Sequence, residues 1–224
     1  MYDSVIAEAR RNCQRTADVR SISVNLSTPE AVLIGMWVAW WILWMVAAVW
    51  SDRAVKAPAR RYHIMYRLLP AAGAAFLFGA IRSSSGEINL WRTSGPVAWG
   101  MVAMAIAGFL FTWWARFTLG RLWSSSVSRK AEHHIVDSGP YGIVRHPIYT
   151  GIILASVATA IQRGTAEAWL GAGLMTFGWC IKARLEERFL RDELGAEAYG
   201  AYAHRVPMLV PLIRPHRSAS AVSH

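Results

Sequence analysis

Cysteine and charged residues are both scarce in this chain of 224 residues. It has only two cysteines, Cys13 and Cys180, which lie far apart and exclude a disulfide-rich scaffold. Charged residues make up 17% of the chain, against about 25% in an ordinary soluble domain. Because 54% of the residues are hydrophobic and 12 are tryptophan, the apolar surplus is too large for one soluble core of this size. A lipid bilayer is the expected solvent.

Five apolar runs predict transmembrane helices. A spanning helix needs about 20 mostly apolar residues, because its backbone must satisfy its own hydrogen bonds across about 30 Å of hydrocarbon. Runs 31–50 and 97–115 come close to or meet this length without a charge. Runs 68–81, 148–161 and 168–181 have 14 uncharged residues each, and the last two could instead be re-entrant or interfacial. We expect an all-α, polytopic integral membrane protein with about five transmembrane helices.

The last two runs are expected to form a helical hairpin. Only the four residues 162–165 join them, which favours a tight connection. Gly151, Ala155 and Thr159 recur every four residues, so they form one stripe of small side chains along a helix. Such a stripe allows close helix packing in membranes, and we expect it to serve this hairpin.

Lysine and arginine are unevenly divided between alternate connecting segments. The richer set holds 5, 5 and 7 basic residues, in segments 51–67, 116–147 and 182–224. The poorer set holds 4, 2 and 1, in segments 1–30, 82–96 and 162–167. Because basic segments stay on the cytoplasmic side, we expect the C terminus inside and the N terminus outside. This asymmetry also accounts for the net charge of +10 without a nucleic-acid partner.

Polar residues are concentrated in two segments on the same predicted side of the membrane. One lies at 133–149, before the fourth run, and the other follows the fifth run. Pro147 suits the first turn of a helix, so Arg145, His146 and Tyr149 are expected at a helix N terminus. Free amide groups and the helix dipole at such an end favour a carboxylate or phosphate ligand.

The second polar segment contains two charged pairs at helical spacing. Lys182 and Glu186 are four residues apart and share a helix face, and Glu187 and Arg191 form a second such pair. On this pattern alone, the segment could equally be a solvated helix end whose charges pair with one another.

Two further groups of residues have simpler interpretations. His133 and His134 have neither a HExxH spacing nor a cysteine partner, so no metal site is expected and both could be surface residues. Trp113, Trp114 and Trp123 are typical of an aromatic belt at the membrane interface.

The order of the motifs is more specific than any one of them. The chain contains SGPY-x₃-RHP-x-Y from Ser138 to Tyr149, then an apolar hairpin, then K-x₃-EE-x₂-L from Lys182 to Leu190. This combination, over about residues 133–213, resembles the isoprenylcysteine carboxyl methyltransferase family and the related phospholipid methyltransferases. The resemblance implies an integral membrane methyltransferase that binds S-adenosylmethionine in a cofactor-binding region on the cytoplasmic side.

The resemblance also implies roles for individual residues. The implied cofactor-binding residues are His133, His134, Ile135, Val136, Tyr141, His146, Pro147, Ile148, Tyr149 and Glu186. Lys182 stands where the family often has a substrate-binding arginine, and we place Arg184 with it as substrate-binding. Lysine keeps the positive charge but loses the bidentate fork of arginine, so this difference bears on the substrate.

The acceptor is expected to be a carboxylate on a lipophilic, isoprenylcysteine-like molecule that arrives from the bilayer. A carboxylate is already ionised at neutral pH and needs only a cation, such as Lys182, Arg145 or Arg184, to hold it. An amine must be neutral to attack, so Glu187 or a histidine would then have to act as a base. Arg145 and Glu187 are therefore the candidate catalytic residues. Phospholipid N-methylation and small-thiol S-methylation remain alternatives.

Two other classes of protein fit the sequence less well. A channel or other non-catalytic membrane protein should place polar residues within several spans, and only Arg67 approaches that. A membrane reductase would need a nicotinamide site, and no glycine-rich dinucleotide motif is present. We expect membrane lipids and a lipophilic substrate as partners, and no protein partner.

The expected organisation has four parts. Residues 1–30 form an N-terminal tail, and residues 31–132 contain the first three transmembrane helices and a connecting segment. Residues 133–213 form a methyltransferase-like region that includes the last two transmembrane helices, and residues 214–224 form a C-terminal tail.

Overall fold

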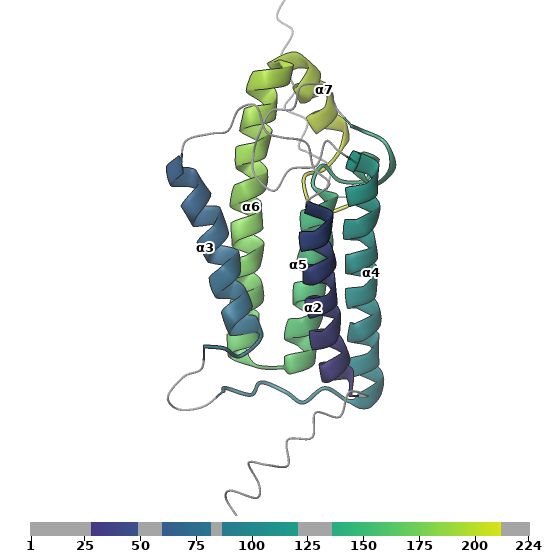
Figure 1. The fold of residues 1–224 in the computed structure, drawn as a ribbon, viewed down its shortest axis with the longest axis vertical. Coiled ribbons are helices and arrows are strands. Elements are labelled where there is room, and N and C mark those ends of the chain that lie inside the picture. The colour runs from purple at the N-terminus through teal and green to yellow at the C-terminus, as the bar shows by residue number, and fades with distance from the viewer. Residues whose placement is uncertain (1–27, 49–59, 82–86, 121–135, 212–224) are drawn as a thin grey trace, which may run out of the picture.

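The computed structural model describes residues 28–48, 60–81, 87–120 and 136–211, and this part of the chain is helical (Figure 1). Its helices are α2 (Pro29–Ala48), α3 (Arg60–Leu77), α4 (Gly95–Leu119), the 3-10 helix η2 (Gly139–Gly142), α5 (Pro147–Arg163), α6 (Ala166–Leu194) and α7 (Ala196–Arg205). The all-α class predicted from the sequence is confirmed. Each of the five apolar runs lies largely within one of the helices α2 to α6.

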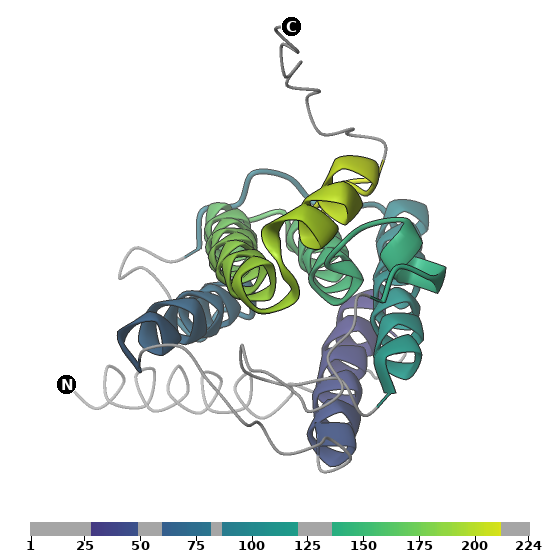
Figure 2. The same cartoon turned by 90° about the horizontal axis from the view of Figure 1, so that it is seen from above.

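Helices α2 to α6 form one bundle in which successive helices run in opposite directions (Figure 1). Helix α4 packs chiefly along α5 and α3 chiefly along α6, while α5 and α6 contact each other between these two pairs (Figure 2). Helices α2, α4 and α6 end, and α3 and α5 begin, at the end of the bundle where α7 lies, which we call the α7 end. The helices therefore alternate in direction, as the count of basic residues in alternate segments assumes. The membrane side that each end faces stays a prediction.

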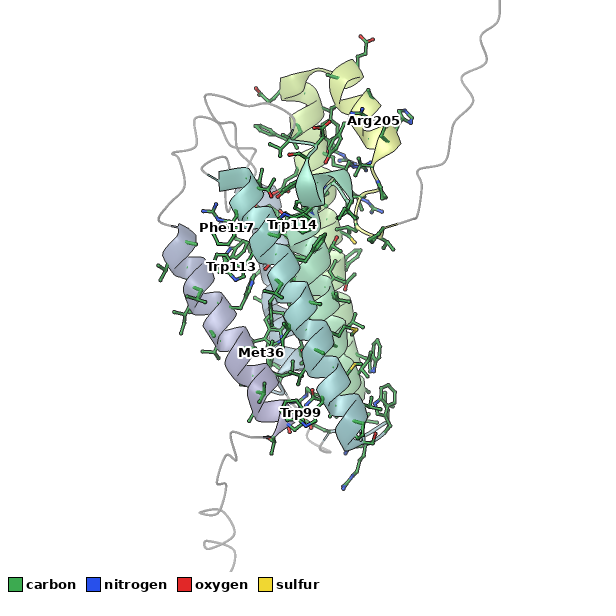
Figure 3. All side chains as sticks on the ribbon, turned by 90° about the vertical axis from the view of Figure 1, so that its right-hand side faces the viewer. Met36, Trp99, Trp113, Trp114, Phe117 and Arg205 are labelled. Atoms are coloured by element: carbon green, nitrogen blue, oxygen red, sulfur yellow. The ribbon has the colours of Figure 1, made fainter. Side chains whose placement is uncertain are left out.

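Two of the described helices, α2 and α4, are long and apolar enough to cross a membrane, judged by length and composition. At about 1.5 Å per residue, the 25 residues of α4 extend over about 37 Å. Trp99 lies near one end of this helix and Trp114 near the other, and these side chains are 50% and 49% exposed (Figure 3). The position of Trp114 is consistent with the predicted aromatic belt at the membrane interface. Trp113 instead packs against Trp44, with ring centroids 5.5 Å apart, and Trp123 lies outside the described residues.

The small-residue stripe of α5 faces α4 and α2, not α6. A Cβ atom on Gly108 of α4 would lie only 2.6 Å from the Gly151 carbonyl oxygen, so the two backbones touch there. The indole N–H of Trp37 donates to Thr159 Oγ1 at 3.0 Å. The prediction that this stripe packs the hairpin is therefore wrong. The stripe occupies one face of α5, and α4 presents Gly108 directly opposite Gly151 on that face.

Replacing Gly108 with alanine is expected to lower the free energy of unfolding by about 1–3 kcal/mol, because the added methyl group has no space between α4 and α5. Gly100 is the matched control on the same helix, since a Cβ atom there meets no other atom within 4 Å. Gly100→Ala is expected to be neutral or stabilising by up to about 1 kcal/mol. Thermal unfolding of both variants in detergent measures the difference, and equal midpoints would contradict the close contact.

Candidate active site

The start of α5 is held at the α7 end of the bundle by the segment that follows α7. The amide N–H groups of Arg145 and His146 donate to the carbonyl oxygens of Pro207 and Met208, at 2.8 and 3.1 Å. Thr150 Oγ1 donates to the carbonyl oxygen of Leu209 at 2.7 Å. The amides of Arg145 and His146, which precede the first turn of α5, are therefore used by the chain itself to fix the entry into this helix.

His146 lies between the two glutamates of α6. Its Nδ1 is 3.6 Å from Glu186 Oε2, and its Nε2 is 3.2 Å from Glu187 Oε1. Burial alone would disfavour a charged ring, but the hydrogen bonds and negative charges of the two glutamates outweigh it, so the pKa of His146 is raised. An imidazolium that donates from both nitrogens fits this arrangement.

Glu187 also forms an ion pair with the guanidinium of Arg145. Arg145 Nε lies 2.7 Å from Glu187 Oε1, and Arg145 Nη1 donates to the carbonyl oxygens of Ala203 and Val206, both at 2.7 Å. Burial would raise the pKa of Glu187, but its contacts with His146 and Arg145 outweigh burial and lower it. Arg145 thus links the start of α5 to both α6 and α7.

The predicted pairing of Glu187 with Arg191 is replaced by these contacts between helices. The guanidinium of Arg191 lies instead over the ring of Tyr199, 5.8 Å from its centroid. Glu187 is only 9% exposed and Lys182 only 7%, so the interpretation as a solvated helix end is wrong for these two residues. The bundle turns this face of α6 inward, toward α5 and α3.

The other predicted pair, Lys182 with Glu186, is confirmed. Lys182 Nζ lies 3.9 Å from Glu186 Oε1, and the same oxygen accepts a hydrogen bond from the Tyr149 hydroxyl at 2.7 Å. The Tyr149 ring stacks between the rings of His146 and Trp179, with centroid distances of 5.4 and 5.0 Å. The RHP-x-Y turn and the double glutamate therefore form one buried cluster.

Three aromatic rings surround the Lys182 ammonium. Its Nζ lies 5.6 Å from the ring centroid of Tyr66, 5.3 Å from that of Tyr149 and 5.5 Å from that of Trp179. The Trp179 indole nitrogen is buried and has no hydrogen-bond partner among the described residues. These rings come from α3, α5 and α6, so three helices contribute to this part of the site.

Part of the chain matches a known protein family. Residues 101–190 match the model of the isoprenylcysteine carboxyl methyltransferase (ICMT) family. Over these residues the chain is similar to this family. The protein-S-isoprenylcysteine O-methyltransferase B of Arabidopsis thaliana is 30% identical over 115 residues, which are 50% of this chain and 58% of that protein. Methanethiol S-methyltransferase 1 of Bradyrhizobium diazoefficiens is 28% identical over 209 residues, which are 84% of this chain and 69% of that protein.

One solved structure has a similar fold. The eukaryotic intramembrane Ras methyltransferase ICMT matches it with a TM-score of 0.50 and 17% identity, over 84% of this chain and 70% of that chain. The match concerns the fold, and α2 and α4 are long and apolar enough to cross a membrane. ICMT family methyltransferases use S-adenosylmethionine. The chain spans less than two thirds of the length of the plant relative.

The remaining family-implied residues have varied surroundings. Tyr141 is buried, and its carbonyl oxygen accepts a hydrogen bond from the Tyr202 hydroxyl at 2.8 Å. Pro147 and Ile148 are buried at the start of α5, and Val136 packs against the same core. Arg184 is exposed, in contrast to Lys182 two residues earlier. His133, His134 and Ile135 lie outside the described residues.

Three residues near this site lie outside the residues predicted from the sequence. Trp179 shares a helix face with Lys182 and Glu186, so its spacing could have identified it. Tyr66 has no such signal, because it lies on a different helix from the motif residues. Arg116, on α4, is buried and donates to the carbonyl oxygens of Ala47 and Gly120, at 2.9 and 2.5 Å. It thereby joins the C-terminal ends of α2 and α4 near the site.

Proposed function

We propose that this protein is a member of the ICMT family and an S-adenosylmethionine-dependent methyltransferase that acts on an acceptor arriving as an anion, at the α7 end of the bundle. The observation that carries this proposal is the position of His146, whose ring nitrogens lie 3.6 Å from Glu186 and 3.2 Å from Glu187. Because each nitrogen faces a carboxylate, neither is turned toward an acceptor from which it could take a proton. The described part of the site is therefore suited to an acceptor that needs no general base.

The residues present fit the proposed cofactor. The Glu186 carboxylate supplies negative charge for a sulfonium or ammonium group, and the stacked rings of His146, Tyr149 and Trp179 supply apolar faces. The buried Trp179 indole N–H is a donor without a partner among the described residues, which a ligand oxygen or nitrogen would satisfy. When bound, S-adenosylmethionine supplies an electrophilic methyl group, whose bond to sulfur breaks so that sulfur leaves as a neutral thioether.

The chain's own residues prepare the site in three ways. Tyr149 and His146 orient the Glu186 carboxylate by contacts to its two oxygens. Arg145 and the carbonyl groups of Pro207 and Met208 fix the entry into α5, which carries both of these residues. Lys182 holds a positive charge inside the bundle, where an anionic acceptor would be drawn toward the methyl group. Arg145 is committed to structural contacts, so its geometry favours a positioning role over contact with the acceptor.

The sequence-based proposal for the acceptor is the carboxylate of a lipophilic, isoprenylcysteine-like molecule. The Arabidopsis relative is named for S-isoprenylcysteine O-methylation, and a carboxylate meets the requirement for an ionised acceptor at neutral pH. An amine acceptor fits less well, because both candidate bases are committed to other contacts: Glu187 lies against Arg145 and His146, and His146 lies between Glu186 and Glu187.

A small thiol is the second candidate, and one specific observation favours it. Lys182 is enclosed by three aromatic rings, an environment that suits a small, soft thiolate held by a point charge more than a carboxylate held by a bidentate fork. Methanethiol S-methyltransferase 1 also aligns with 84% of this chain. A thiol reacts as its thiolate, so the fraction that has already lost its proton to water would bind beside Lys182, whose charge stabilises it.

The division of basic residues supports a cytoplasmic position for the α7 end. In this orientation the C terminus and the site face the cytoplasm, where a water-soluble cofactor enters, and a lipophilic acceptor reaches the same place from the bilayer. The expected boundary of the catalytic region, 133–213, includes every described contact of Arg145, His146 and Glu187 given above.

Binding and turnover assays of the full chain in detergent test the proposed function. We expect saturable binding of S-adenosylmethionine and no binding of NADPH. Release of S-adenosylhomocysteine should then depend on an S-isoprenylated cysteine or on methanethiol, and not on phosphatidylethanolamine. Binding of NADPH alone would favour a reductase, and binding of neither would favour a non-catalytic protein. Turnover with phosphatidylethanolamine would contradict the requirement for an anionic acceptor.

A further inference from the structure

We propose that Tyr66, Tyr149 and Trp179 form an aromatic cage that positions the Lys182 ammonium for the acceptor, with Tyr66 as a positioning residue from outside the family motif. The proposal rests on the proposed function for the role of Lys182 in methyl transfer. The cage itself stands on the geometry of the described residues.

The three rings surround the ammonium at the distance of a cation–π contact. All three centroids lie between 5.3 and 5.6 Å from Lys182 Nζ, inside the limit of about 6 Å for such contacts. Lys182 and Tyr66 are 7% and 3% exposed, so water competes little with the rings. Cation–π contacts strengthen when the partners are desolvated, so three such contacts at one ammonium are expected to stabilise its charge.

A cage solves a specific problem for a lysine in this position. The ammonium is normally strongly hydrated, so burial destabilises its charge. It also ends a flexible four-carbon stem, which by itself does not fix its location. Glu186 Oε1 is 3.9 Å away and already accepts the hydrogen bond of Tyr149, so it only partly compensates the charge. Three rings within cation–π distance stabilise the ammonium and limit where it can lie. A fixed cation is what an acceptor needs in order to meet the methyl group in line.

The register between α3 and α6 brings Tyr66 to this position. The two helices run in opposite directions, and a Cβ atom on Gly178 would lie 2.6 Å from the Pro70 ring. Tyr66 is one turn before Pro70 and Lys182 is one turn after Gly178, so the close contact at Gly178 sets Tyr66 against Lys182. Residues 101–190 carry the family match, so Tyr66 is a contribution of the preceding helix.

The first test measures the Lys182 amine and does not depend on turnover. Only a neutral amine reacts with acetic anhydride, so the pH at which Lys182 becomes acetylated, followed by mass spectrometry of the full chain in detergent, reports how well its charge is stabilised. Tyr66→Leu should make acetylation begin at a pH about one unit lower, whereas Tyr66→Phe, which keeps the ring, should resemble the wild type. Leu77→Val, a change at a buried residue near the other end of α3, is the matched control. An unchanged profile in Tyr66→Leu overturns the cage.

The second test measures catalysis with methanethiol and with an S-isoprenylated cysteine as acceptors. Tyr66→Leu should raise the KM for the acceptor about tenfold, leave the Kd of S-adenosylmethionine within about twofold, and be rescued largely by Tyr66→Phe. An equal loss of cofactor affinity, or a loss shared by Leu77→Val, overturns the positioning role. A wild-type chain that shows the acetylation profile but no methyl transfer refutes the proposed function and leaves the cage intact.

Discussion

Replacing Glu186 with glutamine is expected to weaken S-adenosylmethionine binding about 10- to 100-fold while the bundle stays folded. Glu186 accepts from Tyr149 at 2.7 Å and lies near His146 and Lys182, so its negative charge is held in one place by three neighbours. Glutamine keeps an oxygen for Tyr149 but removes the charge that a cationic cofactor would meet. Hydrogen bonds to charged groups contribute about 1.5–3 kcal/mol, which corresponds to this range of affinity.

Glu197→Gln is the matched control for this prediction, because Glu197 is an exposed carboxylate on α7. It should leave the dissociation constant unchanged, as measured by calorimetry on both variants in the same detergent. Tyr149→Phe should give a smaller loss, since the ring stack remains and only the hydroxyl contact to Glu186 is removed. Unchanged affinity in Glu186→Gln, with melting as in the wild type, would remove Glu186 from the cofactor site.

Replacing Lys182 with methionine is expected to lower kcat/KM for an anionic acceptor about 100-fold, with cofactor affinity nearly intact. Methionine fills a similar volume within the rings of Tyr66, Tyr149 and Trp179 but carries no charge to hold the acceptor. A factor of 100 corresponds to about 2.7 kcal/mol of lost transition-state stabilisation, a reasonable value for one desolvated charge contact. Lys182→Arg should keep a substantial part of the activity, because arginine retains the charge and also stacks on aromatic rings.

The outcome separates two roles for Lys182. If the lysine only neutralises Glu186, which is 3.9 Å away, then Lys182→Met should disturb cofactor binding as much as turnover. Measuring both quantities on the same purified variant distinguishes these cases. Arg188→Met, at an exposed position on α6, is the control for loss of one positive charge from this helix. Normal turnover by Lys182→Met would show that Lys182 does not hold the acceptor.

Much of the helical framework was predictable from local patterns. The five apolar runs correspond to helices α2 to α6, because hydrocarbon solvent requires each segment to satisfy its backbone hydrogen bonds internally. Pro147 begins α5 as expected. The i,i+4 spacing correctly paired Lys182 with Glu186, because a helix brings residues at this spacing onto one face.

Contacts between helices were much less predictable. Glu187 was expected to pair with Arg191 along α6, but it binds Arg145 and His146 of the neighbouring segment instead. The spacing is correct for both pairings, and only the rotation of α6 about its own axis decides between them. The stripe that contains Gly151 shows the same limit: its small residues were evident, but the helix that they contact was not.

The helices, their alternating direction and the family motif could be predicted from the sequence, because each depends on composition or spacing within a short segment. Only the packing of the helices brings His146 between two carboxylates and Tyr66 within reach of Lys182. Those contacts depend on the rotation and register of packed helices, which are set by close approaches such as Gly178 against Pro70 and Gly108 against Gly151. Such approaches involve residues far apart in the chain, and no local period encodes which pairs meet.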